Sequence, residues 1–542
     1  MKNKRLLILL LILAIAAFFR LWQLDKIPPG LYPDVAIYAN DGLNSLQNRD
    51  FKVFYPENNG REGLYMWLLA LSFSIFGVSV WSIKIVTATI GILTVLGLYF
   101  LTKEILQTIS YRLQATNIAL LASFFLATSF WHTNFSRIGF RAILVPFILV
   151  FALYFLIKAF RTQKLSDFIL SGIFWGMGFY TYISFRMAVI ILAVIIILKF
   201  IEYLKKEKPE ISRSHIWKKL YLKDGWWKVD VFLIVIFLVA LPIGIYFLQH
   251  PQDFMGRAAG VSIFQQGNPV KAGILSLISH LGMFNFYGDG NWRHNFANSP
   301  MIFWPVGILF LIGIIISIKE LIFSIKTKNC SLFIAYCLLF SWFFAMLLPG
   351  ILTYEGIPHS LRVIGVIPVV YIFSAIGGFA VYQRLKNIIK NPIGLKLILA
   401  ICLLFFVFVG FSEFYKYFFT WAKNENVEGA FTKKFVEIGY YLNSLPPETE
   451  KYVIVNEPGV PVPWPNGIPM PAQTVMLIER TKFGQPKSTY LLPENLDKIK
   501  IENGVVIVPM KYDEDLFREL SQRFPEGEIK IIDGIWVYKI NG

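Results

Sequence analysis

Long apolar segments alternate with short polar ones over about the first three quarters of the chain. Many of the apolar runs approach 20 residues, the length that an α-helix needs to cross the hydrocarbon core of a bilayer. The pattern therefore predicts a polytopic α-helical membrane protein with about eleven spans. We expect these spans at residues 6–23, 81–101, 117–131, 142–160, 167–183, 187–203, 229–248, 301–318, 330–350, 363–382 and 397–413.

The orientation of the later helices in the membrane depends on whether the segment Gly63–Val78 crosses it. This segment is apolar but only 16 residues long, slightly short for a span. If it crosses the membrane, the strongly basic segment 204–228 lies outside; if it stays at the surface, every strongly basic loop lies inside. The second model places 23 Lys and Arg residues in inner segments and 11 in outer ones, as the positive-inside rule requires. It predicts a cytoplasmic N-terminus, an extracytoplasmic C-terminus and an uncleaved, signal-like first helix.

The outer loop 24–80 contains a second kind of pattern. Small and apolar residues recur at helical spacing from Val35 to Leu46, and Pro33 suits the first turn of a helix. This predicts an amphipathic helix along the membrane surface with Asp34 in its first turn, where the helix dipole stabilises a negative charge. An acid at a membrane edge is a functional candidate, and a plain helix-capping role is the alternative.

The chain changes character after the last predicted span. Residues from about 424 onward contain alternating stretches, KYVIVN, GVVIVPM and EIKIIDGIWVYKI, which are typical of short strands. Residues 431–442 and 514–524 are predicted helices, and the proline-rich PGVPVPWPNGIPMP fits neither structure. We therefore divide the chain into a transmembrane catalytic domain, 1–413, and a small extracytoplasmic α/β domain, 414–542, whose composition favours recognition or support over catalysis.

Composition agrees with a membrane protein and limits its partners. Of the 542 residues, 56% are hydrophobic and 16% are charged, against about 25% charged in soluble domains. The formal net charge of +17 could indicate nucleic acid, but the basic residues lie mainly in short loops between spans. We therefore expect no nucleic-acid partner. The three cysteines lie in apolar segments, so they indicate neither a disulfide framework nor a thiolate metal site.

Unusual polar residues gather in the outer segments. Arginines lie at the outer ends of several apolar segments, in motifs such as HTNFSRIGFR and YEGIPHSLR. A single arginine can simply snorkel to the interface, but several on the face that disfavours positive charge indicate a phosphate ligand, such as a lipid headgroup. The candidate phosphate-binding residues are Arg61, Arg137, Arg141, Arg186, Arg293 and Arg362. The candidates for contact with the rest of the substrate are Tyr38, Tyr182, Trp292, His294, Glu355 and His359.

Histidines and acids of the outer segments could also bind a metal ion. His132, His294 and His359 could join Asp34 or Glu62. No two of these histidines have a ligand spacing such as H-x-x-x-H, so hydrogen bonding to phosphate or sugar is the favoured interpretation. The sequence assigns no metal ligands, and a divalent metal cofactor stays open.

One reaction class fits an outer-face acid, several arginines and access from the lipid. A sugar attached to a polyprenyl phosphate carries a leaving group that needs charge stabilisation more than protonation. The acceptor hydroxyl needs a base, and one carboxylate, Asp34, can serve. Glu62 is the second candidate catalytic acid. A single displacement at the anomeric carbon predicts inversion, in contrast to hydrolases in which two carboxylates flank the bond.

Several motifs resemble the membrane glycosyltransferases of the GT-C superfamily, in particular the branch of protein O-mannosyltransferases and lipid A aminoarabinose transferases (glycosyltransferase family 39-like). The resemblance lies in the first span with its acidic loop, in GREGLYMWLLALSFSIFG, and in SRIGFRAILVPF, GFYTYISFRMA, NWRHN and EGIPHSLRVIGVIP. It covers residues 1 to about 413. It implies the GT-C fold, two juxtamembrane helices in the first outer loop and a polyprenyl-phosphate-sugar donor.

The resemblance also implies roles for the two acids. Asp34 matches the first-loop acid of the family, and Glu62 matches the acid that opens the second juxtamembrane helix. Many members have a further acid directly after the first, where this chain has Val35, and prolines common after the second acid are replaced by Gly63 and Leu64. Some members bind a divalent metal, but their ligands have no match here.

Two other functions stay open. A lipid-linked-glycan transporter or flippase would carry charges within mid-membrane helices and inverted repeats, whereas the charges here cluster at one face. A non-catalytic glycolipid-binding subunit is the other alternative. The sequence does not determine the sugar or the acceptor, which could be a protein, a lipid or a glycan. The expected location is the cell membrane, with an extracytoplasmic active site and C-terminal domain.

Overall fold

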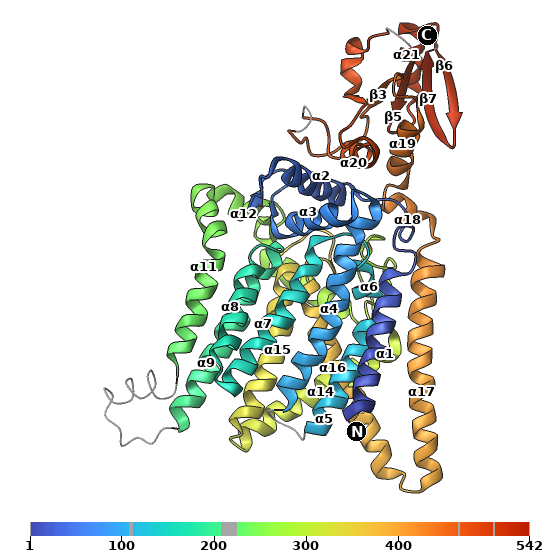
Figure 1. Ribbon diagram of the computed structural model, residues 1–542. Helices are drawn as coiled ribbons and strands as arrows, with labels where there is room; N and C mark the ends of the chain where they lie inside the picture. Colours follow the sequence, from blue (N-terminus) through green and yellow to red (C-terminus); the bar gives the residue numbers. More distant parts are fainter. Residues whose placement is uncertain (1, 108–111, 207–224, 464–466, 502–503, 541–542) are drawn as a thin grey trace. The chain divides into compact units, whose positions relative to one another are not determined.

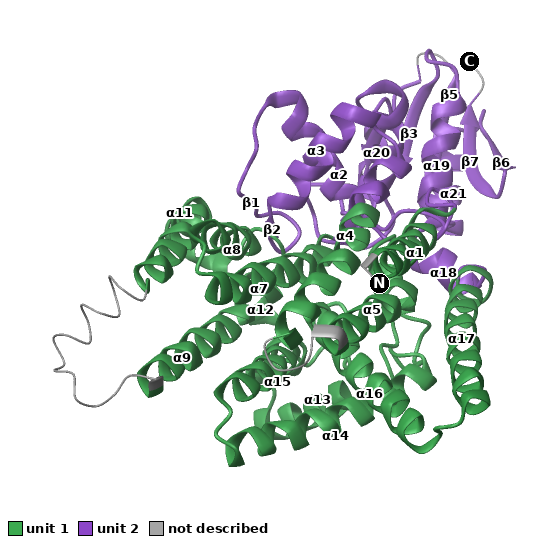
Figure 2. Cartoon of the chain, turned by 60° about the horizontal axis from the view of Figure 1, so that its bottom comes forward, with its two compact units in different colours: residues 1–22, 87–137, 141–421 green, residues 23–86, 138–140, 422–542 purple. Residues whose placement is uncertain are grey.

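The structure is a computed structural model that describes residues 2–107, 112–206, 225–463, 467–501 and 504–540. The chain forms two compact units (Figure 2). Unit 1 contains residues 1–22, 87–137 and 141–421, and unit 2 contains residues 23–86, 138–140 and 422–542. The first outer loop is thus grouped with the C-terminal residues, which the sequence did not predict.

Unit 1 is a bundle of α-helices that run side by side (Figure 1). Its long helices are α1 (Lys2–Leu21), α4 (Val80–Gln107, from residue 87 onward), α5 (Arg112–Thr128), α7 (Leu144–Thr162), α8 (Leu165–Gly178), α9 (Ala188–Lys206), α11 (Trp227–Gln249), α14 (Trp304–Lys326), α15 (Cys330–Ile351), α16 (Ile367–Ile388) and α17 (Pro392–Tyr415). Its shorter helices include α6 (Phe130–Phe135), α12 (Pro251–Gly260) and α13 (Pro269–Gly282).

Eight helical segments of the described chain are long and apolar enough to cross a membrane. They are Val80–Gln107, Arg141–Thr162, Ile183–Lys205, Trp227–Gln249, Trp304–Lys326, Cys330–Ile351, Ile364–Ile388 and Pro392–Trp421. Each overlaps one predicted span, which confirms the polytopic helical fold class. The other three predicted spans fall on α1, with its basic N-terminal turn, and on the shorter helices α5 and α8. Helix α8 packs against α7 and α11, and α5 packs against α1 and α16.

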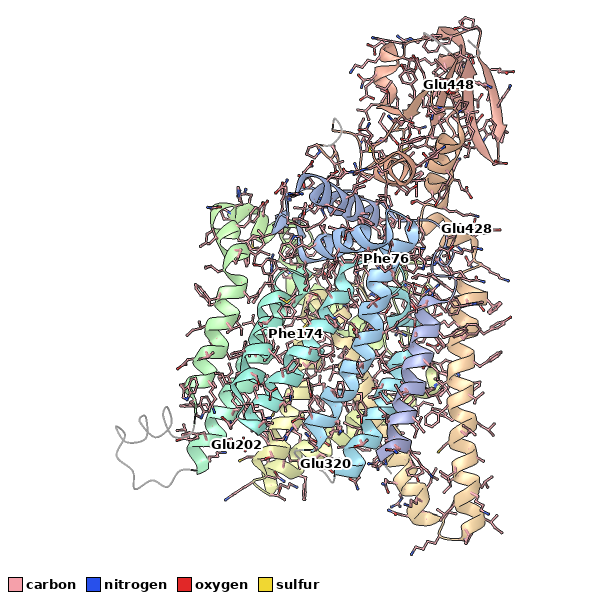
Figure 3. The ribbon with its side chains drawn as sticks, in the orientation of Figure 1. Phe76, Phe174, Glu202, Glu320, Glu428 and Glu448 are labelled. Carbon is pink, nitrogen blue, oxygen red and sulfur yellow. The ribbon has the colours of Figure 1, made fainter. Side chains whose placement is uncertain are left out.

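Two acidic side chains and one aromatic side chain show where one end and the middle of this bundle lie. Glu202 of α9 and Glu320 of α14 lie near one end, whereas Phe174 of α8 lies midway along the helices (Figure 3). The ring of Phe174 stacks on Phe151 and Phe155, with centroids 5.4 and 5.7 Å apart. The segments that connect α5 to α7, α8 to α9, α11 to α14 and α15 to α16 lie at the opposite end (Figure 1).

Glycines let α14 and α16 approach each other closely. A Cβ atom at Gly313 of α14 would lie 1.8 Å from the carbonyl oxygen of Phe373, and one at Gly377 of α16 would lie 2.0 Å from the carbonyl oxygen of Leu309. Small residues at such contacts are typical of membrane helices, which associate by close packing because lipid removes the hydrophobic driving force.

The predicted surface helix forms in unit 2 as α2 (Pro33–Asn48), which has proline in its first turn and buries its apolar face. The antiparallel strands β1 (Phe54–Tyr55) and β2 (Arg61–Glu62) follow, and then α3 (Leu64–Phe76). Helix α3 has 13 residues, about 20 Å at 1.5 Å per residue. This length falls short of a hydrocarbon core of about 30 Å, and the orientation stays a prediction.

The C-terminal residues of unit 2 form a mixed sheet with helices on both faces. The elements are α18 (Glu425–Ala430), α19 (Lys433–Ser444), β3 (Glu450–Ile454), α20 (Ala472–Phe483), β4 (Thr489–Leu491), β5 (Val505–Pro509), α21 (Glu514–Arg523), β6 (Glu528–Ile532) and β7 (Ile535–Ile540). The strand order is β4-β3-β5-β7-β6, in which β3 is parallel to β4 and β5 and β7 is antiparallel to β5 and β6. Alternate residues of β5 face α19 and α20 on one side and α21 on the other.

The alternating stretches of the sequence all form strands, and the two predicted C-terminal helices form as α19 and α21. Helices α20, α12 and α13 and strand β4 were not predicted from the sequence. Every residue of α20 from Ala472 to Arg480 is buried, so the helix has no alternation of apolar and polar faces that could reveal it.

We expect Gly377→Ala to destabilise unit 1, because the added methyl group overlaps the backbone of α14. Overpacking of this kind costs about 1–3 kcal/mol. Gly244→Ala in α11 is the matched control, because a Cβ there meets no neighbouring atom within 4 Å. Thermal unfolding of the purified protein in detergent should show a lower midpoint for Gly377→Ala alone. Equal midpoints for the two variants would contradict the close contact.

Candidate functional site

Asp34 is held by a turn of unit 2. It lies in the first turn of α2, whose N-cap position belongs to Tyr32, so Asp34 is not the capping residue. Its Oδ1 accepts a hydrogen bond of 2.9 Å from Asn58 Nδ2, and its side chain is half-buried. Asn58, Asn59 and Gly60 all have positive φ, a conformation that asparagine and glycine tolerate. The turn between β1 and β2 therefore orients a partly exposed carboxylate.

Arg61 and Glu62 of β2 are buried, with exposures of 1% and 3%. Arg61 forms ion pairs with Asp41 of α2 and with Glu57, the latter at 3.3 Å between Nη2 and Oε2. Its guanidinium carbon lies 6.0 Å from the ring centre of Tyr38. Burial raises the pKa of Asp41, and the charge of Arg61 offsets part of that rise. Arg61 thus ties α2 to the β1–β2 turn, and a phosphate would compete there with two acids.

In unit 1, two loops separated by α14 and α15 bring Asp289, His294 and His359 together. The potential ligand atoms of the three side chains lie within 4.8 Å of one another. His294 Nδ1 donates to Asp289 Oδ2 at 3.0 Å, since a carboxylate only accepts. The rings of His294 and His359 have centroids 5.1 Å apart. Because the cluster comes from distant loops, it leaves no ligand spacing in the sequence.

Further hydrogen bonds hold this cluster in place. The backbone N–H and the hydroxyl of Ser360 both donate to Asp289 Oδ2 at 2.8 Å, and the N–H of Asn291 donates to Oδ1 at 2.8 Å. His280 of α13 accepts at Nε2 from the backbone N–H of His359 at 3.1 Å, and its Nδ1 donates to a backbone carbonyl at 2.8 Å. His280 is therefore a neutral support, and burial lowers its pKa.

The charge of Asp289 suits a cation. Burial alone would raise its pKa, but the interactions with His294 and His359 and the hydrogen bond from Asn291 together outweigh burial and hold the pKa below its usual range. One carboxylate and two histidines form a ligand set for Zn²⁺ and similar divalent ions. The donors from Ser360 and Asn291 match the outer hydrogen bonds that orient metal ligands. These residues therefore fit a divalent cation, which would displace the Nδ1 proton of His294 if that nitrogen ligates.

Three of the predicted phosphate-binding arginines in unit 1 hydrogen-bond to acceptors within the protein. Arg137 is fully buried and donates to two carbonyl oxygens at the C-terminal end of α1, at 3.0 and 2.7 Å. Arg186 donates to the carbonyl oxygen of Phe254 and lies over its ring. Arg362 donates to the carbonyl and the carboxylate of Glu355, at 2.8 and 3.1 Å. A phosphate would have to compete with these acceptors.

The remaining candidates have different surroundings. Arg141 begins the apolar segment that continues into α7, and its guanidinium carbon lies 5.3 Å from the ring centre of Tyr182. The structure thus brings together two candidates from separate segments. Arg293 is partly exposed and donates through Nε to Asn291 Oδ1 at 3.3 Å. The carbonyl of Trp292 accepts a hydrogen bond from the indole of Trp421 at 3.0 Å.

Sequence reasoning noticed Asp289 as an outer acid but gave it no role, and it did not single out Asn58 or His280. The NNG turn around Asn58 was a readable signal for a residue that supports Asp34. No local signal marks His280, because its partner His359 lies beyond two spans.

Comparisons with known proteins agree with the fold. Residues 64–217 match the family model described as dolichyl-phosphate-mannose-protein mannosyltransferase. The chain is similar to the archaeal oligosaccharyltransferase AglB from Archaeoglobus fulgidus, in complex with an inhibitory peptide and a dolichol-phosphate, with 15% identity and a TM-score of 0.51 over 100% of this chain and 74% of that one. Comparison with curated proteins finds no match.

A second solved structure is similar along nearly its whole length. It is ArnT from Cupriavidus metallidurans bound to undecaprenyl phosphate, with 13% identity and a TM-score of 0.54 over 98% of this chain and 97% of that one. At such identities the likeness shows a shared fold. Together with the family match over residues 64–217, it agrees with the resemblance of the sequence to membrane glycosyltransferases of the GT-C superfamily.

The cluster of Asp289, His294 and His359 is expected to bind one Zn²⁺ per chain. Because histidine ligands must be unprotonated, binding should weaken as the pH is lowered. Equilibrium dialysis of the purified protein, followed by metal analysis, measures the stoichiometry. Asp289→Asn and His359→Ala should each lower the affinity at least about tenfold.

His250→Ala is the control for this measurement, because His250 is exposed at the C-terminal end of α11. It should leave zinc binding unchanged. A wild-type chain that binds no zinc, or a zinc affinity that is insensitive to Asp289→Asn, would show that the cluster is only an internal ion pair.

Proposed function

We propose that the chain transfers a sugar from a polyprenyl-phosphate-linked donor to an acceptor hydroxyl at the extracytoplasmic face, with inversion. The observation that carries the proposal is Asp34, a partly exposed carboxylate fixed at the start of a surface helix by Asn58. The similar proteins support the donor class, since their structures contain dolichol-phosphate and undecaprenyl phosphate. The charge asymmetry of the loops, 23 basic residues against 11, supports the orientation.

Asp34 has the surroundings that a general base requires. The first turn of α2 stabilises its negative charge, and the amide of Asn58 holds one oxygen at 2.9 Å. In the reaction, a carboxylate oxygen takes the proton of the acceptor hydroxyl as that oxygen forms a bond to the anomeric carbon. The bond from this carbon to the phosphate oxygen breaks, and the electron pair leaves with the polyprenyl phosphate. Glu62 is buried next to Arg61 in β2, which makes it a supporting acid in this scheme.

The donor phosphate is an anion that needs fixed positive charge. Among the predicted arginines, we assign this role to Arg141, whose guanidinium lies beside the ring of Tyr182, and to Arg293, which lies partly exposed next to Asn291. Tyr182 lies beside Arg141 and can stack on a sugar ring. A divalent cation held by Asp289, His294 and His359 would add positive charge for an anionic group of the substrate.

Asp34→Asn should reduce turnover at least about 100-fold, because the amide cannot accept the proton. The Michaelis constant for the donor should change little, since the amide keeps the shape of the side chain. The assay measures the transfer of labelled mannose or aminoarabinose from undecaprenyl and dolichyl phosphate to a cell-envelope extract by the purified protein.

Asp50→Asn is the control for that assay. Asp50 lies near Asp34 in sequence and its side chain is 63% exposed, so its charge should not matter for turnover. Full turnover by Asp34→Asn would remove Asp34 as the base. Movement of the intact lipid-linked sugar across a liposome membrane without transfer would favour the flippase alternative.

Arg141→Gln should weaken binding of undecaprenyl phosphate about tenfold or more, because hydrogen bonds to a charged group contribute about 1.5–3 kcal/mol. Binding can be measured by the quenching of tryptophan fluorescence in nanodiscs. Arg384→Gln, at an exposed site in the last turns of α16, is the control. If Arg141→Gln binds the lipid with unchanged affinity, Arg141 merely anchors its helix at the interface.

A further inference from the structure

Helix α2, which carries Asp34, has a row of polar residues along one face. Contact with a membrane surface does not explain this row, because part of it is buried within the protein. Asn40, Asn44 and Gln47 recur at helical spacing. Asn40 is 1% exposed, and a buried amide is costly unless its hydrogen bonds are made. The partners of this row come from α20, more than 400 residues away in sequence.

Arg480 of α20 is the centre of these contacts. It is 3% exposed. Its Nη1 donates to Asn40 Oδ1 at 3.1 Å and to the carbonyl of the same residue at 3.3 Å. Its Nη2 donates to Asn44 Oδ1 at 2.7 Å and to Gln47 Oε1 at 3.0 Å. One planar guanidinium therefore binds four acceptor atoms of three residues along two turns of α2, which fixes both the rotation and the axial position of that helix.

Other bonds hold α2 and the segment before it to the same part of the chain. Asn40 Nδ2 donates to the side-chain and backbone oxygens of Gln473, at 2.9 and 3.1 Å. The carbonyl of Leu31 accepts from the hydroxyls of Thr432 and Thr474, at 3.0 and 3.2 Å. Gly30 has φ +78°, and a Cβ there would lie 2.3 Å from a backbone oxygen. The residues before and after Asp34 are thus held in place by hydrogen bonds to the C-terminal part of unit 2.

The position of helix α2 depends on its packing. Helix α2 has 16 residues, and in proteins most of the stability of such a helix comes from tertiary contacts rather than from helix propensity. The direction of Asp34 depends on the rotation of α2, since a turn of one residue about the helix axis swings a side chain by about 100°. Catalysis by a base is sensitive to such changes, because a displacement of about 1 Å can cost about 100-fold in rate.

We propose that the C-terminal part of unit 2 positions the base, and that Arg480 does so by fixing the rotation and axial position of α2. The proposal rests on the proposed role of Asp34. Arg480 touches neither Asp34 nor the reacting groups in this scheme, so it is a positioning residue and not a catalytic one. This gives the C-terminal domain a support function in catalysis.

The test is Arg480→Leu in the full-length protein, followed by two measurements. Hydrogen exchange detected by mass spectrometry should show that peptides of α2 lose protection about tenfold or more, whereas peptides of β3 and β5 keep theirs. The transfer assay should show turnover lowered about tenfold or more with a donor Michaelis constant within about twofold of wild type. Arg480→Lys keeps the positive charge but loses the planar guanidinium with its fixed donors. It should give intermediate values of α2 protection and of turnover.

Two further variants make the result specific. Asn44→Ala combined with Gln47→Ala removes acceptors from the α2 side and should reproduce both effects even if Arg480→Leu folds poorly. Arg518→Leu, at a 61% exposed site of α21, is the matched control and should change neither measurement.

Each other outcome overturns the proposal in a recognisable way. Unchanged protection of α2 would show that Arg480 does not fix the helix. Equal loss of protection in β3 and β5 would show that Arg480 only stabilises the domain. Loss of protection in α2 with unchanged turnover would show that the rotation of α2 does not matter to catalysis. Failure of the proposed base is seen separately, as full turnover by Asp34→Asn with an intact Arg480.

Discussion

Buried ionic side chains that bond to helix ends hold the connecting loops of unit 1 together. Arg20 of α1 is fully buried and donates to the carbonyl oxygens of Leu126 and Ala127, which are the last turn of α5, at 3.2 and 2.9 Å. Glu413 of α17 accepts from the backbone N–H of Phe130 at the start of α6, at 2.7 Å. In a low-dielectric interior an unsatisfied backbone group costs several kcal/mol, so helices can end inside the protein only where such side chains reach them.

The same requirement gives a structural role to some of the arginines at the outer ends of the apolar segments. Arg137 closes the end of α1 as Arg20 closes the end of α5. The sequence alone does not distinguish an arginine that donates to backbone carbonyl oxygens from one that binds a phosphate. Both lie beside an apolar segment, and both lie on the outer face, where the positive-inside rule disfavours basic residues. Part of the arginine pattern therefore has a structural origin. Arg141, whose guanidinium lies beside the ring of Tyr182, stays a predicted ligand of the phosphate.

What the sequence predicted and what it missed differ in the range of the interactions involved. Spans, the surface helix α2 and the strands β3, β5, β6 and β7 follow from periodic burial, which is a local property. Helix α20 is buried on all sides, so apolar and polar residues do not alternate along it with the helical repeat. Asp34 was predicted from its neighbours in the chain, but Arg480 and the cluster around Asp289 depend on contacts between distant segments, for which a single sequence offers no periodic signal.

The surroundings of two carboxylates suggest why one would serve as a base and the other would not. Asp289 accepts hydrogen bonds from His294, from Asn291 and twice from Ser360. The interactions with His294 and His359 and the hydrogen bond from Asn291 outweigh burial and hold the pKa of Asp289 below its usual range, so this carboxylate keeps its charge. Asp34 receives an amide hydrogen bond from Asn58 and is half-buried, which leaves an oxygen with the capacity to accept a proton. Asp289 therefore suits charge stabilisation, and Asp34 suits the proton transfer of the proposed reaction.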